Sequence, residues 1–257
     1  MSRTPLRDAG PRRRVHPLAV VAVGLAVLVV ASLVIARMGD RPAPSGTSGD
    51  YPVVAVGPED GVPPPGPQHA AVDLVWPIDL TWTTVAGLDL PVSRQAGPRD
   101  LAGGLAKGFS QTPAGAVLAA LHLVVRTSPQ VGPQVWGPTL REQVVGPDTA
   151  AYADAVEQGY ETAREQLQIS YGEPLGRIYA SIRGVRVDAY SPQAASLRLL
   201  IEAPGGDGGL ARAAAVVQVS WSGTDWQLIA PPRGDWATVR VLVPAEVARA
   251  YTPLPGR

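Results

Sequence analysis

The feature that most constrains this chain is a run of nineteen residues without a charged side chain, residues 18–36 (LAVVAVGLAVLVVASLVIA). About 20 apolar residues in an α-helix, at about 1.5 Å rise per residue, cross the roughly 30 Å hydrocarbon core of a bilayer. The run therefore predicts a transmembrane helix, and with it a lipid bilayer as a partner through residues 18–36. Five arginines and one aspartate precede the run, so the positive-inside rule predicts a cytoplasmic N-terminus.

A cleaved secretory signal is the alternative interpretation of this segment, because Val34-Ile35-Ala36 resembles a weak cleavage site. The run is longer than the roughly 7–15 apolar residues of a signal peptide, and Arg37 would become the first mature residue. These features favour an uncleaved anchor. We therefore expect a single-pass protein of the cell membrane whose C-terminal domain is extracytoplasmic.

The composition changes after the apolar run. Residues 39–77 contain nine prolines and six glycines and show no helical or alternating period, which is typical of a linker. The following stretch of about 170 residues has the size of one domain. We expect five regions: a basic cytoplasmic tail (1–17), the transmembrane helix (18–36), a Pro/Gly-rich linker (37–79), an extracytoplasmic domain (80–250) and a C-terminal tail (251–257).

The charge balance differs between the two sides of the predicted membrane helix. The whole chain has 22 basic and 22 acidic side chains, but five arginines and only one aspartate lie within residues 1–36. The remainder is mildly acidic and contains the only lysine, Lys107. A surface of this kind releases few counterions from a phosphate backbone. We therefore expect no direct nucleic-acid binding by the outer domain.

A well-marked helix is expected in the first half of the domain, after a strand pair or an extended segment between Leu80 and Val92. Thr112 and Pro113 fit the N-cap and first position of a helix that runs to Arg126. Its only polar residue between Gly115 and Arg126 is His122. A helix that is apolar on all sides must be enclosed on more than one side.

Two further helices and then a series of strands are expected. A short helix is predicted around residues 138–145, and a longer one from Asp148 to about Gln168. The apolar stripe of the longer helix is expected to consist of Tyr152, Val156, Tyr160, Ala163 and Leu167. Beyond residue 184 the period becomes two, and the loop 222–225 places Trp221 opposite Trp226. The predicted fold class is α+β: an N-terminal transmembrane helix, then a bent antiparallel sheet packed around helices.

The sequence offers little for catalysis. No hydrolase elbow, phosphate-binding loop, zinc-peptidase motif, EF-hand loop or complete dinucleotide fingerprint is present, and cysteine is absent. His16 and His69 are remote from His122, which we interpret as a buried, hydrogen-bonded residue rather than a general base. We therefore expect a non-enzymatic protein with no catalytic, cofactor-binding or metal-binding residues and no cofactor.

The remaining polar and aromatic candidates have structural interpretations. Three carboxylates are expected in loops, where they favour turns: Asp207, Asp225 and Asp235. Six tryptophans supply most of the aromatic mass, and we expect most of them to anchor the core or loops, with one or two at an interface: Trp76, Trp82, Trp136, Trp221, Trp226 and Trp236.

Taken together, this organisation resembles actinobacterial single-pass membrane proteins of conjugative elements. Their outer domain is similar to the nuclear transport factor 2-like (cystatin-like) cone of the VirB-type inner-membrane bridging subunit of type IV secretion systems. The segments that carry the resemblance are Gly108-Phe109-Ser110-Gln111-Thr112-Pro113-Ala114-Gly115-Ala116, the hairpin Trp221–Leu228 and the loop Pro231–Trp236. These motifs are structural and carry no functional residue.

The resemblance implies a scaffold or assembly subunit of a conjugative DNA-transfer apparatus, which acts through protein–protein contacts. Its implied partners are other subunits of that apparatus and further copies of itself, as a homo-oligomer. The alternative function is a ligand-binding or lipid-transport accessory protein of similar fold. That alternative predicts an open apolar cone lined by residues such as Leu121, Val125 and Leu199. An enzyme with an acid–base pair in the same cone is a third, weaker possibility.

Overall fold

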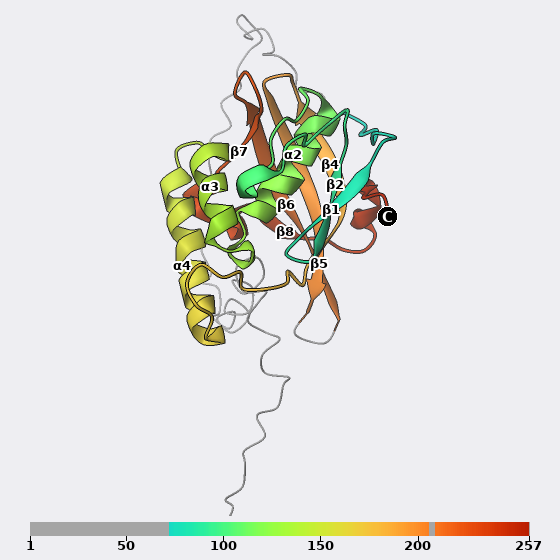
Figure 1. Cartoon of the computed structure of the whole chain (residues 1–257). Coiled ribbons are helices and arrows are strands. Elements are labelled where there is room, and N and C mark those ends of the chain that lie inside the picture. The colour runs from blue at the N-terminus through green and yellow to red at the C-terminus, as the bar shows by residue number, and fades with distance from the viewer. Residues whose placement is uncertain (1–71, 206–208, 257) are drawn as a thin grey trace, which may run out of the picture.

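The computed structural model describes residues 72–205 and 209–256, which form an α+β domain (Figure 1). The first element is a hairpin of β1 (Thr81–Val85) and β2 (Leu88–Val92), in which Thr81 pairs with Val92. Its turn, Ala86-Gly87, has positive φ at both residues, the geometry that joins antiparallel strands most tightly. The predicted strand pair is therefore confirmed.

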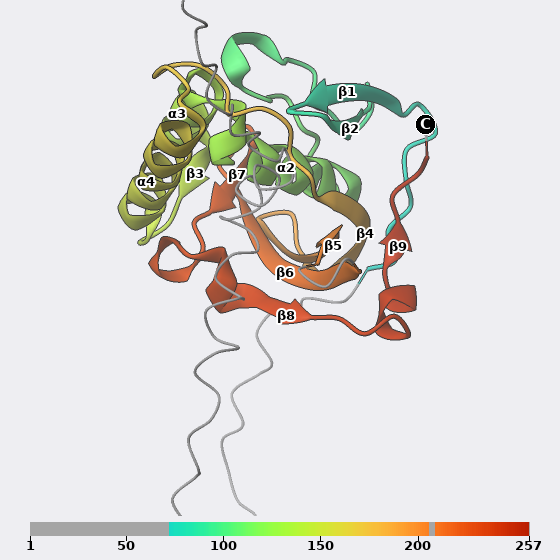
Figure 2. The same ribbon diagram turned by 90° about the horizontal axis from the view of Figure 1, so that it is seen from below.

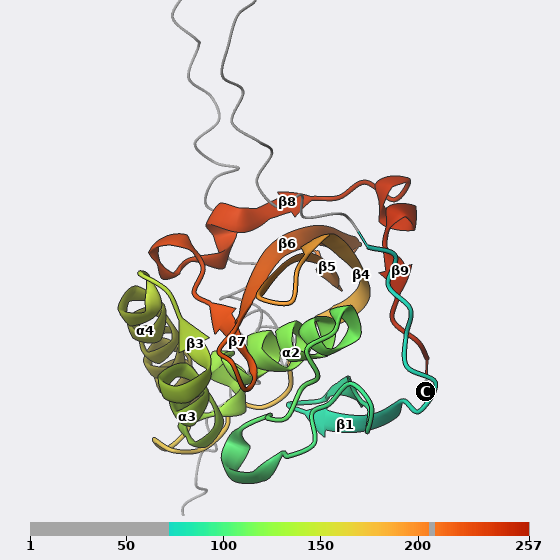
Figure 3. The ribbon, with the colours of Figure 1, turned by 90° about the horizontal axis from the view of Figure 1, so that it is seen from above.

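The central helix is α2 (Pro113–Arg126), which begins and ends where the sequence predicts. The Thr112 hydroxyl accepts a hydrogen bond from the Gly115 amide at 3.1 Å, so the N-cap forms as expected. Every residue from 115 to 126 is buried. Figures 2 and 3 show why: α2 lies between the concave face of a curved sheet and the β1–β2 hairpin.

The other two helices are α3 (Pro133–Gln143) and α4 (Thr149–Leu167). Helix α3 starts five residues earlier than expected, because Gly132 takes a positive φ of 84° and Pro133 then occupies the first helical position. Pro138 lies inside this helix rather than at its start. Helix α4 buries Tyr152, Val156 and Tyr160 of its predicted apolar stripe, whereas Ala163 and Leu167, nearer its C-terminus, are only partly buried.

The main sheet has the strand order β3-β7-β6-β5-β4-β9, and β8 also pairs with β6. The strands are β3 (Val144–Val145), β4 (Ser181–Tyr190), β5 (Ala194–Pro204), β6 (Leu210–Trp221), β7 (Trp226–Ile229), β8 (Arg240–Leu242) and β9 (Thr252–Pro253). All their pairings are antiparallel except that of β3 with β7. The prediction of an antiparallel sheet was therefore wrong: the sheet is mixed, because α3 returns the chain to the sheet edge in the direction of β7.

The β6–β7 hairpin agrees with its prediction. Trp221 and Trp226 are cross-strand partners, and their rings meet edge to face with 5.4 Å between the centroids. Ring pairs in this arrangement contribute more than their buried area alone. The two rings therefore stabilise the hairpin directly beside its loop, residues 222–225.

The predicted fold class included a transmembrane helix, and the structure contradicts this part of the prediction. Within residues 72–205 and 209–256, no helix is both long enough and apolar enough to span a bilayer. Helix α2 is apolar but has 14 residues, about 21 Å at the usual rise, and α4 has 19 residues but several carboxylates. The predicted span itself, residues 18–36, lies outside the described residues, as do the tail 1–17 and most of the linker.

The domain extends beyond residues 80–250 at both ends. Leu74 is buried in the core, and the indole Nε1 of Trp76 donates a hydrogen bond to the Pro253 carbonyl at 3.0 Å. Strand β9 pairs with β4 through Thr252 and Pro253. Segments that the sequence analysis placed in the linker and in the C-terminal tail therefore lie against each other and complete the sheet edge.

Candidate functional site

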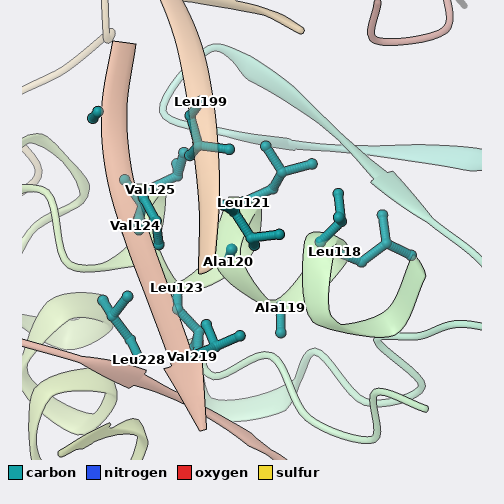
Figure 4. Packing of buried hydrophobic residues seen from close by; sticks show 14 of the residues in the cluster. Leu118, Ala119, Ala120, Leu121, Leu123, Val124, Val125, Leu199, Val219 and Leu228 are labelled. Atoms are coloured by element: carbon teal, nitrogen blue, oxygen red, sulfur yellow. The ribbon is translucent and has the colours of Figure 1, made fainter. Parts of the chain in front are cut away.

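The interior of the curved sheet is filled by α2. Leu121, Val125 and Leu199, which the ligand-binding alternative placed around an open cone, are all buried, at 0%, 4% and 0% exposure. Figure 4 shows the side chains of α2 packed among those of the strands, including Val219 and Leu228. The expectation of an open apolar cone at these residues was wrong, because the helix occupies the space that a ligand would need.

His122 lies on α2 and is fully buried. Its Nε2 is 2.9 Å from the Pro91 carbonyl oxygen, which can only accept, so Nε2 carries the proton. Its Nδ1 has no hydrogen-bond partner among the described residues. Burial lowers the pKa of the imidazole to about 3; the bond to Pro91 opposes this shift and the charge of Arg126 adds to it. The ring is neutral and inaccessible, as expected for a structural histidine.

Arg126 occupies the last position of α2 and is also buried, with 5% exposure. Its Nη1 donates to the Gly104 carbonyl at 3.1 Å, whereas its Nε has no partner among the described residues. Burial lowers the pKa of this guanidinium. A cation at a helix C-terminus is stabilised by the helix dipole, which gives Arg126 a structural role in holding the segment at Gly104.

Asp225 has a larger role than the turn residue that the sequence suggests. One carboxylate oxygen, Oδ2, accepts from the Gly108 amide at 2.7 Å, while Oδ1 accepts from the amides of Phe109 at 3.1 Å and Trp226 at 2.9 Å. The neighbouring Trp226 donates its indole N–H to the Ser110 carbonyl at 2.8 Å. The hairpin 221–228 and the segment 108–116, both of which carry the family resemblance, therefore bind each other.

We expect Asp225→Asn to lower the free energy of unfolding by about 1–2 kcal/mol, because the side-chain amide of asparagine leaves one part-buried backbone N–H facing another N–H group. Asp235→Asn is the matched control. Asp235 accepts from the Ala237 amide at 2.8 Å, and asparagine caps such a position as well as aspartate does. Urea unfolding of both variants measures the difference. Equal stability losses would show that Asp225 acts only as a turn residue.

The other polar and aromatic candidates from the sequence do not come together in a common site either. Asp207 lies outside the described residues. Trp236 donates to the Tyr152 hydroxyl at 2.9 Å, which donates to Thr127 at 2.8 Å, so the loop 231–236 is fixed to α4 and α2. Within the described ranges no three His, Asp or Glu side chains gather as metal ligands do. The tryptophans with described contacts anchor the core and the loops.

One open groove of ≈ 740 Å³ lies beside the start of the β1–β2 hairpin. Its polar lining includes Asp79, whose carboxylate is held by the Ser93 hydroxyl at 2.6 Å and the Gln95 amide at 3.2 Å. The hydrogen bond from Ser93 lowers the pKa of Asp79. The lining also has two arginines and apolar side chains: Arg94, Arg99, Leu80, Val92 and Pro98.

The convex outer face of the sheet carries an arginine-rich surface that the sequence analysis missed. Asp188 accepts from Arg186 at 2.7 Å and from Arg198 at 2.6 Å. These three residues form the first arginine group, in which Arg186 and Arg198 are direct cross-strand partners. The alternation of these arginines with apolar residues along β4 and β5 is the sequence signal that predicts such a face.

A second arginine group lies further along the same face. Glu202 accepts from Arg212 at 2.5 Å and pairs with Arg183 at 3.1 Å. The C-terminal segment 243–251 crosses the sheet between the two groups, where Tyr251 covers Leu200. Each group contains two guanidinium ions and one carboxylate, so each has an excess positive charge. We call the two groups together the arginine face.

The comparisons with known proteins give one match. Residues 43–246 match the family described as "Domain of unknown function (DUF8175)". No curated protein and no solved structure matches the chain. None of these findings links the chain to type IV secretion or conjugation, so the assignment that the resemblance implied is not supported.

Proposed function

The chain belongs to the family of domains of unknown function DUF8175, and from this premise we propose that its domain is a non-enzymatic assembly subunit that works through protein–protein contacts. The observation that carries the proposal is the filled interior of the curved sheet. Because α2 packs against the concave face, the two arginine groups on the convex face, on either side of the segment 243–251, remain available for binding.

The chemistry of the convex face supports a protein partner. Arginine is enriched at protein interfaces, where its planar guanidinium forms paired hydrogen bonds with carboxylates. Asp188 and Glu202 hold the arginines in fixed positions on the rigid strands β4–β6, which reduces the entropy lost on binding. Arg186 also lies over the Tyr251 ring, 5.6 Å from its centroid. The face is therefore preorganised for acidic protein surfaces.

A site-specific photo-crosslinker in the full chain tests this function in the host cell. Gln218 is exposed and pairs with Ser196 on the arginine face. We expect a crosslinker at Gln218 to give discrete protein adducts, and the matched position Thr224, at the tip of the β6–β7 hairpin, to give none. Adducts that vanish when the first arginine group is reversed in charge support the proposal. Equal adduct patterns at both positions, or no adduct, contradict it.

A ligand-binding accessory protein is the second candidate, and the groove beside β1 and β2 favours it. The groove combines apolar side chains with Arg94 and Arg99, and Arg99 is oriented by the carbonyls of Gly108 at 3.1 Å and Gln95 at 3.3 Å. A few fixed polar groups in an apolar lining are typical of small-molecule sites. In the same experiment, loss of crosslinking together with a small molecule retained in native mass spectra would favour this candidate.

A further inference from the structure

Residues 37–257 contain 17 basic and 21 acidic side chains, so an excess of positive charge on one surface of the domain is accompanied by a larger excess of negative charge elsewhere. The arginine face holds such an excess, because Asp188 and Glu202 are each shared by two arginines. The side chain of Arg183 is 60% exposed, and those of Arg186 and Arg198 are more than one-third exposed. The surface is therefore open to a partner with negative charge.

Helix α4 carries four carboxylates and one arginine, so it contributes negative charge to the surface. Its carboxylates Asp154, Glu157, Glu161 and Glu165 are spaced three, four and four residues apart, which places them along one side of the helix. We call them the acidic stripe. It lies opposite the side that carries the buried Tyr152, Val156 and Tyr160.

The acidic stripe has little compensation within its own helix. Arg164 is the only basic residue of α4, and it bonds Glu161 through its Nε at 2.6 Å. The neighbours Glu157 and Glu161, and likewise Glu161 and Glu165, have like charges at a spacing of four residues, which destabilises a helix in isolation. The stripe gains stability when a positive surface covers it.

The two surfaces cannot meet within one copy of the domain. Figures 2 and 3 place α4 beside β3 and β7, on the opposite side of the domain from β4 and β9. A contact between the acidic stripe and the arginine face therefore requires two molecules. Such a contact uses different surfaces on its two sides, so each copy still has one surface of each kind for a further neighbour.

We propose that a second copy of this chain docks the acidic stripe of its α4 onto the arginine face, and that repeated head-to-tail contacts build a ring or a filament. This inference rests on the proposed function and names one partner for the same face. A second copy fits better than a nucleic acid, because the carboxylates of Asp188 and Glu202 interrupt the positive charge. Charge complementarity of this kind provides register and specificity.

Sedimentation of the full chain tests the proposal with two charge reversals. The stripe reversal is Asp154→Arg, Glu157→Arg and Glu165→Arg, which keeps the Glu161–Arg164 pair. The face reversal is Arg186→Glu, Asp188→Arg and Arg198→Glu. It keeps one charge between two opposite charges, so the three side chains can still form ion pairs with one another. We expect each reversal to weaken self-association at least about tenfold, and a mixture of the two reversed proteins to restore it.

Two controls separate this effect from a general change of charge or fold. Asp73→Arg with Asp89→Arg adds positive charge on the segment before β1 and on β2, away from the stripe, and is expected to leave association unchanged. Wild-type association is expected to weaken from low to high salt, because exposed charges are screened. Circular dichroism shows whether each variant is folded.

The outcomes decide the proposal. Wild-type chains that do not associate at low salt, folded reversals that associate like the wild type, or a mixture that fails to restore association each overturn it. Binding of a nucleic acid, or only of a different acidic protein, to the wild-type arginine face without self-association also overturns it. In the last case the adducts from Gln218 would persist with that protein, so the proposed function would stand without the head-to-tail contact.

Discussion

Replacement of Gly115 by alanine is expected to lower the free energy of unfolding by about 3 kcal/mol or more. A Cβ atom at this position would overlap the Ser110 carbonyl oxygen and lie 2.7 Å from the Ser110 hydroxyl oxygen. Ser110 cannot move freely, because its carbonyl accepts the indole N–H of Trp226. The substitution therefore disturbs both the start of α2 and its link to the β6–β7 hairpin.

Thr112→Ala is the comparison variant for this prediction. It removes the hydroxyl that accepts from the Gly115 amide and that also shares a hydrogen bond with the Ser110 hydroxyl at 2.7 Å, and loss of such a helix N-cap costs about 1 kcal/mol. Chemical denaturation of both variants measures the two values. If Gly115→Ala is no less stable than Thr112→Ala, the segment before α2 adapts to the added methyl group, and the close approach of Ser110 is not a structural requirement.

Acid is expected to destabilise the domain through His122 well above the pH at which most carboxylates titrate. The imidazole has a pKa of about 3 in the folded chain and 6.5 as its ordinary value. The unfolded chain therefore binds one more proton between these values, and stability falls as the pH falls through this window. The expected loss is about 1.4 kcal/mol for each pH unit below 6.5.

Urea unfolding between pH 7 and 4.5 measures this loss, and His122→Gln provides the control. Glutamine keeps an N–H donor toward the Pro91 carbonyl but does not titrate. The lowered pKa of Asp79 contributes to stability above its ordinary value of 3.8, and this contribution is lost below that pH, outside the tested range. Parallel loss of stability in wild type and variant would show that another group is responsible.

Local signals in the sequence predicted the parts of the fold that depend on neighbouring residues. The start of α2 is defined by Pro113 and by the Thr112 hydroxyl, which accepts a hydrogen bond from the amide three residues later. Trp221 and Trp226 meet across a four-residue loop. The enclosure of α2 followed from its apolar surface alone. In each case the interacting residues are close in the sequence, or the physical requirement belongs to one element.

The remainder depends on partners far apart in the chain. Strand β3 has two residues and exists because Val144 and Val145 meet β7, more than 80 residues later. The role of Asp225 was missed because the amides that it binds are 116 and 117 residues away. The arginine face cannot be predicted unless the pairing of β4, β5 and β6 is known. The acidic stripe becomes a candidate binding surface only when the arginine face is known.

The contact between Trp76 and Pro253 has a mechanical consequence. Residues 72–76 begin the described domain, and the last strand, β9, lies beside them (Figures 1 and 2). Tension applied at one end therefore passes to the other through the contact between Trp76 and Pro253. The strands β5–β7 and the helix α2 lie outside this short path. Strand β4, which carries Arg183, Arg186 and Asp188, pairs with β9 and therefore borders this path. The acidic stripe on α4 lies on the other side of the domain, so the domain can be held by its ends without loading that surface.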